Sequence, residues 1–549
     1  MNWRVTILGV LLVTALGYLW HQKYGSSLLA DEQTDFASTF VQLKGQYIDV
    51  PQEGREASGG ATTSLGKHIL VVSGGGQFHL VEPNGKVLPA RIAPPANGYE
   101  DYVEVSKRPP YDKYEHRYDW FRVFDLARFE GESGTGLLIS YMKFHKDRAC
   151  YGTAIARAMI PAGIDATKVA IGAGDWVDIF ETEPCLPLKS QWRAFEGHMA
   201  GGRLAVDQGN GRVLLGSGDY AWDGMYAPLS PDPDSAVALA QDMNADYGKV
   251  IAIDIASGES EILSRGQRNI QGIAVDDNGT VWTVEHGPRG GDELNEVQPG
   301  RNFGWPLETF GTKYSGLPVN GTISLGRHDT YDQPAFSWLP SVAVSGMTMV
   351  HDFHEVWDGD MLVSTLAGQR LVRIRTNGGR IVFAENIPIG KRMRHIHQHT
   401  DGTIVILLDN QQEPGTRLLL LRPVEGSAGA RFVENYMANV LDVSSSTRAD
   451  VQMKIDECME CHSFTPRDNA KAPSLAEVYG SKVGATGYEG YSAALRSSND
   501  RWTRDRLDAF LKDSGSVYPG TSMPNPKIAD DDVRAAVIDV LEALRTTQE

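Results

Sequence analysis

The chain has 549 residues, of which 41% are hydrophobic and 22% are charged, so it is neither a small single domain nor a disordered or collagen-like chain. Its 52 basic and 70 acidic side chains give a formal net charge of −18, which argues against a nucleic-acid partner because phosphate contacts need positive surfaces. Only 4 residues are cysteine, too few for a disulfide scaffold in so long a chain. At roughly 100–200 residues per domain, the length predicts two to four domains.

The chain begins with an apolar segment. Residues 5–20 are apolar apart from two Thr and two Gly, and Trp3, Tyr18 and Trp20 lie near its ends. About 16 residues is short for a hydrocarbon core of about 30 Å, although interfacial aromatic side chains extend the span. We expect residues 1–30 to be a signal anchor, with a cleaved signal peptide as the alternative. Either leader places the remaining chain on the periplasmic side of a bacterial inner membrane.

Residues 40–424 consist of short apolar or alternating runs separated by Gly, Asn and Asp turns, which predicts an all-β region. A unit of strand, Asx-Gly turn and strand recurs, with turns at Asn210-Gly211, Asn278-Gly279 and Asp401-Gly402. The separations fit one and two blades of about 60 residues, so we expect a β-propeller of about six blades. A pair of β-sandwiches is the competing fold.

Two cysteines, Cys150 and Cys185, lie in loop contexts of this region. Outside the cytoplasm, a disulfide between these two cysteines is favoured over two free thiols.

Several loops of the β region carry chemistry. His198 stands in a Gly-rich loop before a strand, where a neutral imidazole can take a proton, although a lone loop histidine is usually only solvated. Two repeat units begin with arginines at equivalent places, Arg268 with Asn269 and Arg392 with Arg394. In a closed propeller these guanidinium groups could point into one funnel, formed by the loops at its mouth, and bind a carboxylate-rich ligand. The acidic, turn-rich loop 285–295 suits Ca²⁺, with a solvated loop as the plain alternative.

Four motifs together, G-H-x-x-G-G-R, R-N-x-Q-G, E-H-G-P-x-x-x-D-E-x-N and N-x-G-W-P, resemble the soluble quinoprotein glucose and aldose sugar dehydrogenases. Those enzymes use pyrroloquinoline quinone (PQQ) on a six-bladed propeller. The resemblance implies His198 as general base, with Arg268, Asn269, Arg392 and Arg394 on PQQ or substrate. It implies one calcium on backbone oxygens of Gly287 and Pro288, and a second held by Glu293 and Phe303. A lysine that the family places near the quinone is replaced here, within Thr365-Leu366-Ala367-Gly368.

Near the C-terminus, Cys458-Met459-Glu460-Cys461-His462 matches the C-x-x-C-H pattern of covalent haem attachment, with a zinc or redox site as the alternative. Met523, in a Pro- and Gly-rich stretch, is the one methionine after His462. Helical spacing is expected over residues 451–457, 502–512 and 530–545.

This region resembles class I cytochromes c. The resemblance implies thioether links from Cys458 and Cys461 to haem c, with His462 and Met523 as iron ligands. We therefore expect a linker over residues 425–447 and a small all-α cytochrome c domain over residues 448–549, appended to a mainly β chain.

These features favour an oxidoreductase in which a sugar (aldose or pyranose) or related alcohol is oxidised by hydride transfer to calcium-bound PQQ. Electrons would then pass through haem c to the respiratory chain or a soluble cytochrome. A non-catalytic propeller that binds carbohydrate or a partner is the alternative, and the missing lysine favours it slightly. A third hypothesis is a calcium-dependent propeller hydrolase such as a lactonase, but a hydrolase has no obvious use for a haem domain.

Overall fold

The computed structural model describes residues 33–546 except 40, 53, 56, 132–133, 191–196, 410–415, 425–432, 434–435, 439, 465–470 and 486. The predicted leader, residues 1–30, lies outside the described residues. Among the helices in the described ranges, none has the length and apolarity needed to cross a membrane.

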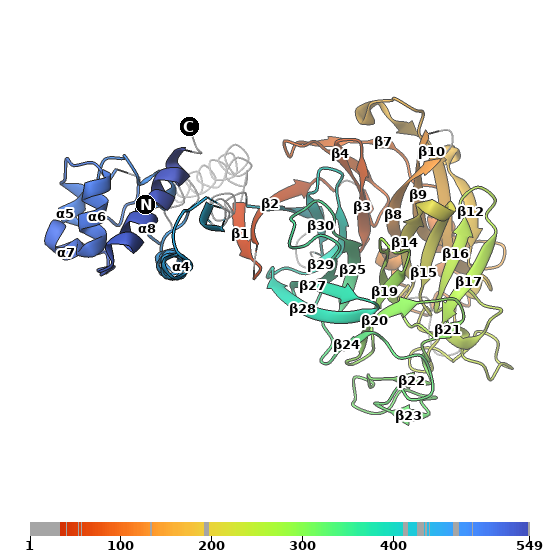
Figure 1. Ribbon diagram of the computed structural model, residues 1–549. Coiled ribbons are helices and arrows are strands. Elements are labelled where there is room, and N and C mark those ends of the chain that lie inside the picture. The colour runs from red at the N-terminus through yellow and green to blue at the C-terminus, as the bar shows by residue number, and fades with distance from the viewer. Residues whose placement is uncertain are drawn as a thin grey trace, which may run out of the picture. The chain divides into compact units, whose positions relative to one another are not determined.

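Six antiparallel sheets form the first unit, which ends at Pro423, and each is one blade of a β-propeller (Figure 1). The first three blades, from innermost strand outward, are β3 (Gly60–Leu65), β4 (His68–Ser73), β5 (Phe78–Val81) and β6 (Val87–Pro89); β8 (Val123–Gly131), β9 (Gly134–His145), β10 (Cys150–Met159) and β12 (Val177–Glu181); and β14 (Gly201–Asp207), β15 (Arg212–Ser217), β16 (Lys249–Asp254) and β17 (Ser260–Arg265).

The last three blades are β18 (Ile270–Val275), β19 (Val281–Glu285), β20 (Asp292–Val297) and β24 (Phe336–Trp338); β25 (Val344–Met349), β26 (Met361–Thr365), β27 (Arg370–Asn377) and β28 (Arg380–Pro388); and β29 (Met393–Gln398), β30 (Ile404–Leu408), β31 (Thr416–Pro423), β2 (Gln42–Val50) and β1 (Gln33–Ala37). The sixth blade therefore combines the end of the unit with its beginning, and the pairing of β2 with β31 closes the ring.

The innermost strands β3, β8, β14, β18, β25 and β29 contact one another in a closed circle. They surround a central channel of about 440 Å³. Each repeat recognised in the sequence is the inner hairpin of one blade, namely β14–β15, β18–β19 and β29–β30. Gly211, Gly279 and Gly402 have φ values of 65°, 79° and 87°, a region that suits glycine, which explains the Asx-Gly turns. The predicted propeller is confirmed.

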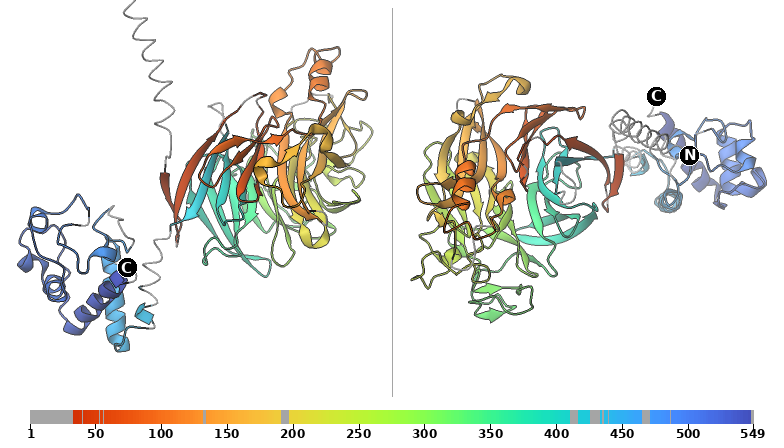
Figure 2. Two further views of the ribbon diagram at one scale, coloured as in Figure 1. Left: turned by 90° about the horizontal axis from the view of Figure 1, so that it is seen from above. Right: turned by 180° about the vertical axis from the view of Figure 1, so that it is seen from behind.

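Shorter elements connect the blades. They are β7 (Arg91–Ile92), α2 (Tyr99–Ser106), η1 (Tyr118–Trp120), η2 (Ala166–Lys168), β11 (Ala170–Ile171), η3 (Ala173–Asp175), β13 (Leu186–Pro187), η4 (Gln208–Asn210), η5 (Leu239–Gln241), β21 (Arg301–Asn302), β22 (Glu308–Thr309) and β23 (Ser324–Leu325). Helix α2, orange at the rim of the propeller in Figure 2, is a helix in a region where we expected none. It forms because Tyr102 and other aromatic side chains of residues 99–121 bury themselves against blade 2.

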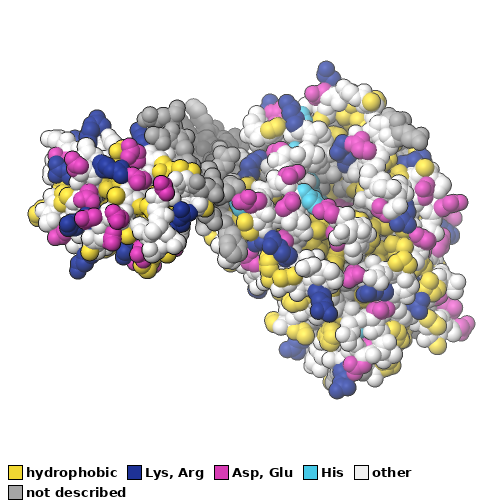
Figure 3. Space-filling view, in the orientation of Figure 1, with side chains coloured by type: hydrophobic (Ala, Val, Ile, Leu, Met, Phe, Trp, Pro, Cys, Tyr) yellow, Lys and Arg dark blue, Asp and Glu magenta, His cyan; other side chains and the backbone are white. Residues whose placement is uncertain are grey.

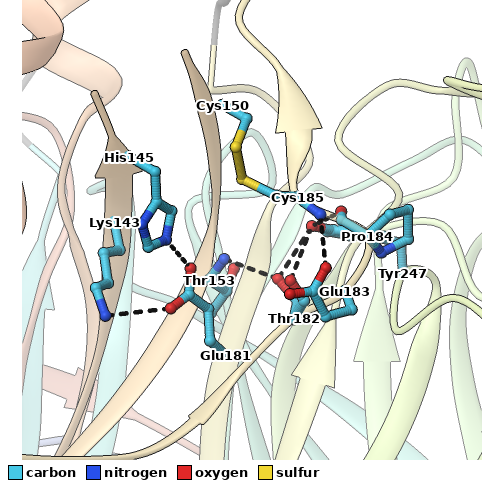
Figure 4. Close-up of a disulfide and its surroundings, with 10 residues drawn as sticks. All are labelled: Lys143, His145, Cys150, Thr153, Glu181, Thr182, Glu183, Pro184, Cys185 and Tyr247. Atoms are coloured by element: carbon cyan, nitrogen blue, oxygen red, sulfur yellow. Dashed lines mark hydrogen bonds and ion pairs between the residues drawn. A yellow bond between two sulfur atoms is a disulfide. The ribbon is translucent and has the colours of Figure 1, made fainter. Parts of the chain in front are cut away.

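A disulfide joins Cys150, the first residue of β10, to Cys185, which precedes β13 (Figure 4). The two Cα atoms are 5.6 Å apart. The bridge ties the edge of blade 2 to the segment that leads toward His198.

The second unit spans residues 424–549 and is helical. Its elements are α4 (Ser445–Met459), η6 (Leu475–Glu477), α5 (Ala493–Arg496), α6 (Arg504–Lys512), α7 (Ser514–Val517) and α8 (Asp531–Thr546). Helices α4, α6 and α8 coincide with the three stretches of helical spacing. Apolar side chains such as Ile455, Phe510 and Val537 form one buried core between them.

The packed part of this unit extends into the stretch that we expected to be a linker. Val433, Met437 and Leu441 are buried in its core. The Ser444 side chain accepts a hydrogen bond from the Thr447 amide and begins α4, so the serine run is a helix cap.

Candidate active site

The loop that carries His198 connects to the inner strand of blade 3. The His198 imidazole packs edge to face with the Trp120 indole, and the two ring centroids are 4.2 Å apart. The following residues hold the loop in place, because the Gly201 amide donates to Asn269 Oδ1 at 3.2 Å and the Tyr220 amide donates to the Met199 carbonyl at 3.0 Å. His198 is half-buried.

Arg268 and Asn269 lie between β17 and β18. Arg268 is buried, and its Nη1 donates to the carbonyl oxygens of His286 at 3.2 Å and Gly287 at 2.9 Å. Its guanidinium carbon lies 5.2 Å from the Trp305 ring centroid, which gives the N-x-G-W-P motif a structural role. The fold therefore brings the R-N-x-Q-G and E-H-G-P motifs into direct contact.

Acidic side chains are buried next to this loop. Glu285 Oε2 accepts the Arg268 amide at 2.5 Å, and Asn295 donates to Glu285 Oε1 at 2.9 Å. Burial raises the pKa of Glu285 to about 7, and burial together with the neighbouring Glu285 charge holds the pKa of Glu293 well above its usual range. Glu285, Glu293 and Glu308 line one small cavity with Phe303.

Arg392 and Arg394 bind the same carboxylate. Arg392 Nε donates to Asp409 Oδ2 at 3.0 Å, and Arg394 Nη2 donates to Asp409 Oδ1 at 2.8 Å. These contacts lower the pKa of Asp409 against the opposing effect of its burial. His286 lies within electrostatic range of both Arg268 and Arg394, so the two arginine-bearing loops face the same region.

Three residues of this region escaped the sequence analysis. Trp120 contacts His198, and Asp409 bridges the paired arginines. Asp219 accepts from Trp305 Nε1 at 2.7 Å, and burial with the nearby Asp223 charge raises its pKa to about 8. Glu285 is the last residue of the second strand of its repeat, and Asp219 and Asp409 follow the second strands of theirs, so the repeats contained a signal for the two acids that were missed.

The residues present fit an anionic quinone cofactor and a hard cation. The buried Arg268 Nε has no hydrogen-bond partner among the described residues, which suits an added acceptor such as a carboxylate. Glu285 and Glu293 repel each other in a buried site, a donor set that a divalent cation stabilises. The Gly287 carbonyl accepts one bond from Arg268 and keeps a second lone pair for a cation.

The second unit holds a separate apolar cavity of about 220 Å³. Cys458, Cys461, His462 and Met523 all line it, as the C-x-x-C-H interpretation requires. His462 Nδ1 lies 2.7 Å from the Pro473 carbonyl oxygen, which fixes the ring and leaves Nε2 for a metal. Burial lowers the pKa of His462 and so favours the neutral ring that binds iron. The residues therefore fit a covalent haem.

Comparisons with known proteins divide the chain in the same way. The family model for glucose/sorbosone dehydrogenases matches residues 133–420. The aldose sugar dehydrogenase YliI of Escherichia coli is 31% identical over 247 residues, which cover 41% of this chain and 61% of that protein. The chain thus spans about three fifths of this relative. Cytochrome c2 iso-2 of Magnetospirillum molischianum is 33% identical over 97 residues, 18% of this chain and 100% of that protein.

Among solved structures, the apo-form of the soluble aldose sugar dehydrogenase from Escherichia coli aligns with a TM-score of 0.52 and 24% identity. The alignment covers 69% of this chain and 100% of that one, and it supports the six-bladed propeller fold. The family match extends over more than half of the chain and includes every loop of the funnel from His198 to Asp409. The chain therefore belongs to the glucose/sorbosone dehydrogenase family, and its C-terminal region is homologous to cytochromes c.

Proposed function

We propose that this chain is a PQQ-dependent dehydrogenase that oxidises a sugar or related alcohol and passes the electrons through its own haem c. The observation that carries the proposal is the meeting of the His198, Arg268–Asn269 and Glu285–Pro288 loops through hydrogen bonds. They are tied by Gly201 to Asn269 and by Arg268 to Gly287.

When bound, PQQ supplies a quinone that accepts a hydride, and Ca²⁺ supplies a Lewis acid that polarises it. Arg268, Asn269, Arg392 and Arg394 bind and orient the cofactor through hydrogen bonds and charge. The backbone oxygens of Gly287 and Pro288 hold the first calcium, whereas Glu293 and Phe303 hold the second.

His198 acts as the general base in this proposal. Its neutral imidazole takes the hydroxyl proton of the substrate while the carbinol carbon loses a hydride, so an alcohol becomes a carbonyl. Trp120 fixes the imidazole plane from the side. Asn269 positions the loop of His198 through the Gly201 amide.

In the second unit, Cys458 and Cys461 attach the haem, and His462 and Met523 bind its iron. Ligation by His and Met favours a raised reduction potential, suited to accepting electrons. The final acceptor is a respiratory-chain component or a soluble cytochrome. The apolar leader and the Cys150–Cys185 disulfide support a periplasmic location, with the leader as an anchor or a cleaved signal.

The proposal is tested by reconstituting the full chain with Ca²⁺ and PQQ and following haem reduction by absorbance during a screen of aldoses and alcohols. We expect His198→Ala to slow sugar-dependent haem reduction by about 100-fold or more. The matched control is His351→Ala, because His351 is half-exposed and lies 3.6 Å from Asp277, away from this funnel. Haem reduction by no substrate, or equal rates in the wild type and His198→Ala, would reject the proposal.

A further inference from the structure

Arginines lie close to the start of four inner strands, and two of them, Arg122 and Arg268, form no ion pair with a carboxylate among the described residues. Arg122 precedes β8, Arg203 lies near the start of β14, Arg268 precedes β18, and Arg394 lies near the start of β29. Arg203 lies 4.0 Å from Asp125, and Arg394 is paired with Asp409. In the described ranges of the chain, no carboxylate lies within ion-pair distance of Arg122 or Arg268, and Arg268 donates to the backbone carbonyls of His286 and Gly287.

Arg122 is only 6% exposed, and its hydrogen bonds go to neutral oxygens. Nη1 donates to Ser58 Oγ at 2.9 Å and to the Ser58 carbonyl at 3.5 Å. Nε is buried and has no hydrogen-bond partner among the residues that the structure describes. A buried guanidinium normally has a charged partner, because the loss of its hydration is costly.

The charges around Arg122 make its protonated form still less favourable. Burial and the positive charges of Arg394 and Arg203 lower the pKa of Arg122 to about 9. Asp409 is the nearby acid that opposes this effect, but it already binds Arg392 and Arg394. Arg122 therefore remains protonated at neutral pH and lacks a counter-charge.

Arg122 also lies next to the candidate base. Its guanidinium carbon is 4.6 Å from the Trp120 ring centroid, and the His198 ring centroid is 4.2 Å from the same indole. Arg117 is 5.6 Å from this ring as well, but Asp119 binds it at 2.8 Å. Arg122 and His198 therefore both lie against the Trp120 indole.

We infer that Arg122 binds a carboxylate of the substrate, and that the substrate class is an acidic sugar such as a hexuronate. Guanidinium and carboxylate groups match as a two-point hydrogen-bonded pair, which a neutral sugar cannot form. The inference rests on the proposed function, since His198 defines where the substrate lies. The redox step is unchanged: the carbinol carbon gives a hydride to the quinone, the hydroxyl proton goes to His198, and the substrate carboxylate does not react.

The first test measures binding without turnover. Isothermal titration calorimetry of the full chain with D-glucuronate and, separately, with D-glucose should show at least tenfold tighter binding of the acid. Arg122→Gln should remove this preference, and Arg122→Lys should restore part of it. The matched control is Arg128→Gln, because Arg128 is a partly exposed arginine of β8 that pairs with Glu130. No difference in D-glucuronate binding between the wild type and Arg122→Gln overturns the inference, whether or not any sugar is oxidised.

The second test separates substrate from cofactor, since PQQ also carries carboxylates. With the reconstituted protein, Arg122→Gln should lower the ratio of kcat/KM for D-glucuronate to that for D-glucose at least tenfold. Titration with PQQ in the absence of sugar should give the same affinity in both proteins. A weaker PQQ affinity with an unchanged ratio assigns Arg122 to the cofactor and overturns the inference while the proposed function stands. If no sugar reduces the haem, the proposed function fails, and calorimetry alone decides the role of Arg122.

Discussion

At the scale of single residues, the funnel is defined by charged groups that are buried before any ligand is added. Glu285 accepts two backbone amides, from Arg268 and Asn269, and Asp219 accepts the Trp305 indole proton. The pKa values of these acids are raised to about 7 and about 8 because burial outweighs these hydrogen bonds. Their protonation therefore responds to pH near neutrality and to any cation that binds beside them.

This arrangement predicts a pH-dependent stability of the calcium-free protein. The ordinary pKa of Glu285 is 4.5, so between pH 4.5 and about 7 the folded protein keeps a proton that the unfolded chain has released. The stabilising contribution of Glu285 to the free energy of unfolding is therefore greatest below pH 4.5, and it is lost as the pH rises through about 7. We expect Glu285→Gln, which cannot ionise, to unfold at a higher temperature than the wild type at pH 8 in a chelator, and at a similar temperature at pH 5.

The measurement is thermal unfolding by circular dichroism at pH 5, 6, 7 and 8, with a chelator and with Ca²⁺. Bound Ca²⁺ should remove the advantage of Glu285→Gln, because it stabilises the ionised carboxylate. A wild-type protein that is as stable as the variant at pH 8 in the chelator would contradict the raised pKa.

At the scale of elements, three inner hairpins, β14–β15, β18–β19 and β29–β30, each carry an arginine near their beginning and an acid at or after their end, with a glycine in the turn between the strands. Because the innermost strands form one closed circle, equivalent positions of different blades meet at one mouth of the propeller. Acidic and basic side chains are interspersed on the face shown in Figure 3. The disulfide acts at the same scale, since it joins β10 to the segment leading to His198 (Figure 4).

Replacing both Cys150 and Cys185 by Ser should destabilise the propeller by about 3 kcal/mol, because the unfolded chain gains the freedom of a loop closed over 35 residues. Urea unfolding followed by tryptophan fluorescence measures the change. Unfolding of the helical unit, followed by haem absorbance, serves as the internal control and should not shift. Equal urea midpoints for variant and wild type would show that the bridge adds no stability.

At the scale of the whole molecule, two units with separate cores lie in one chain, and each has its own candidate site. In the proposed function the chain couples them, since a two-electron oxidation at the propeller must leave through a one-electron carrier. A substitution that changes only the haem site should therefore separate sugar oxidation at the propeller from electron transfer to the haem.

Met523→Ala should lower the haem potential, because a thioether ligand favours the reduced iron. A fall of about 59 mV makes haem reduction tenfold less favourable. Sugar-dependent haem reduction, followed by stopped-flow absorbance, should slow, whereas sugar-dependent reduction of a small artificial dye that accepts electrons from the propeller should keep its rate. If the dye rate fell in parallel, Met523 would act on the folding of the chain rather than on the relay.

Much of this molecule was readable from local patterns. The Asx-Gly hairpins and the helical spacing depend on residues a few positions apart, so the sequence predicted the propeller and the helices α4, α6 and α8. The haem ligands stay a prediction, and the structure brings the four residues to one cavity. Helix α2 was missed because its residues are fixed by aromatic packing against blade 2, and residues 433–441 read as a linker because their apolar partners lie far along the chain.

The sequence by itself determined which residues are candidates for the chemistry: His198, the arginines of the repeats, the acidic loop and the haem motif. Only the tertiary structure decided how they are paired. Packing of neighbouring blades brings Trp120 to His198, the β29–β30 hairpin places Asp409 between two arginines, and Arg122 is left without a carboxylate among the described residues. The contact between Trp120 and His198 joins two blades, and the pattern of residues along one strand does not specify which side chain of another blade it meets.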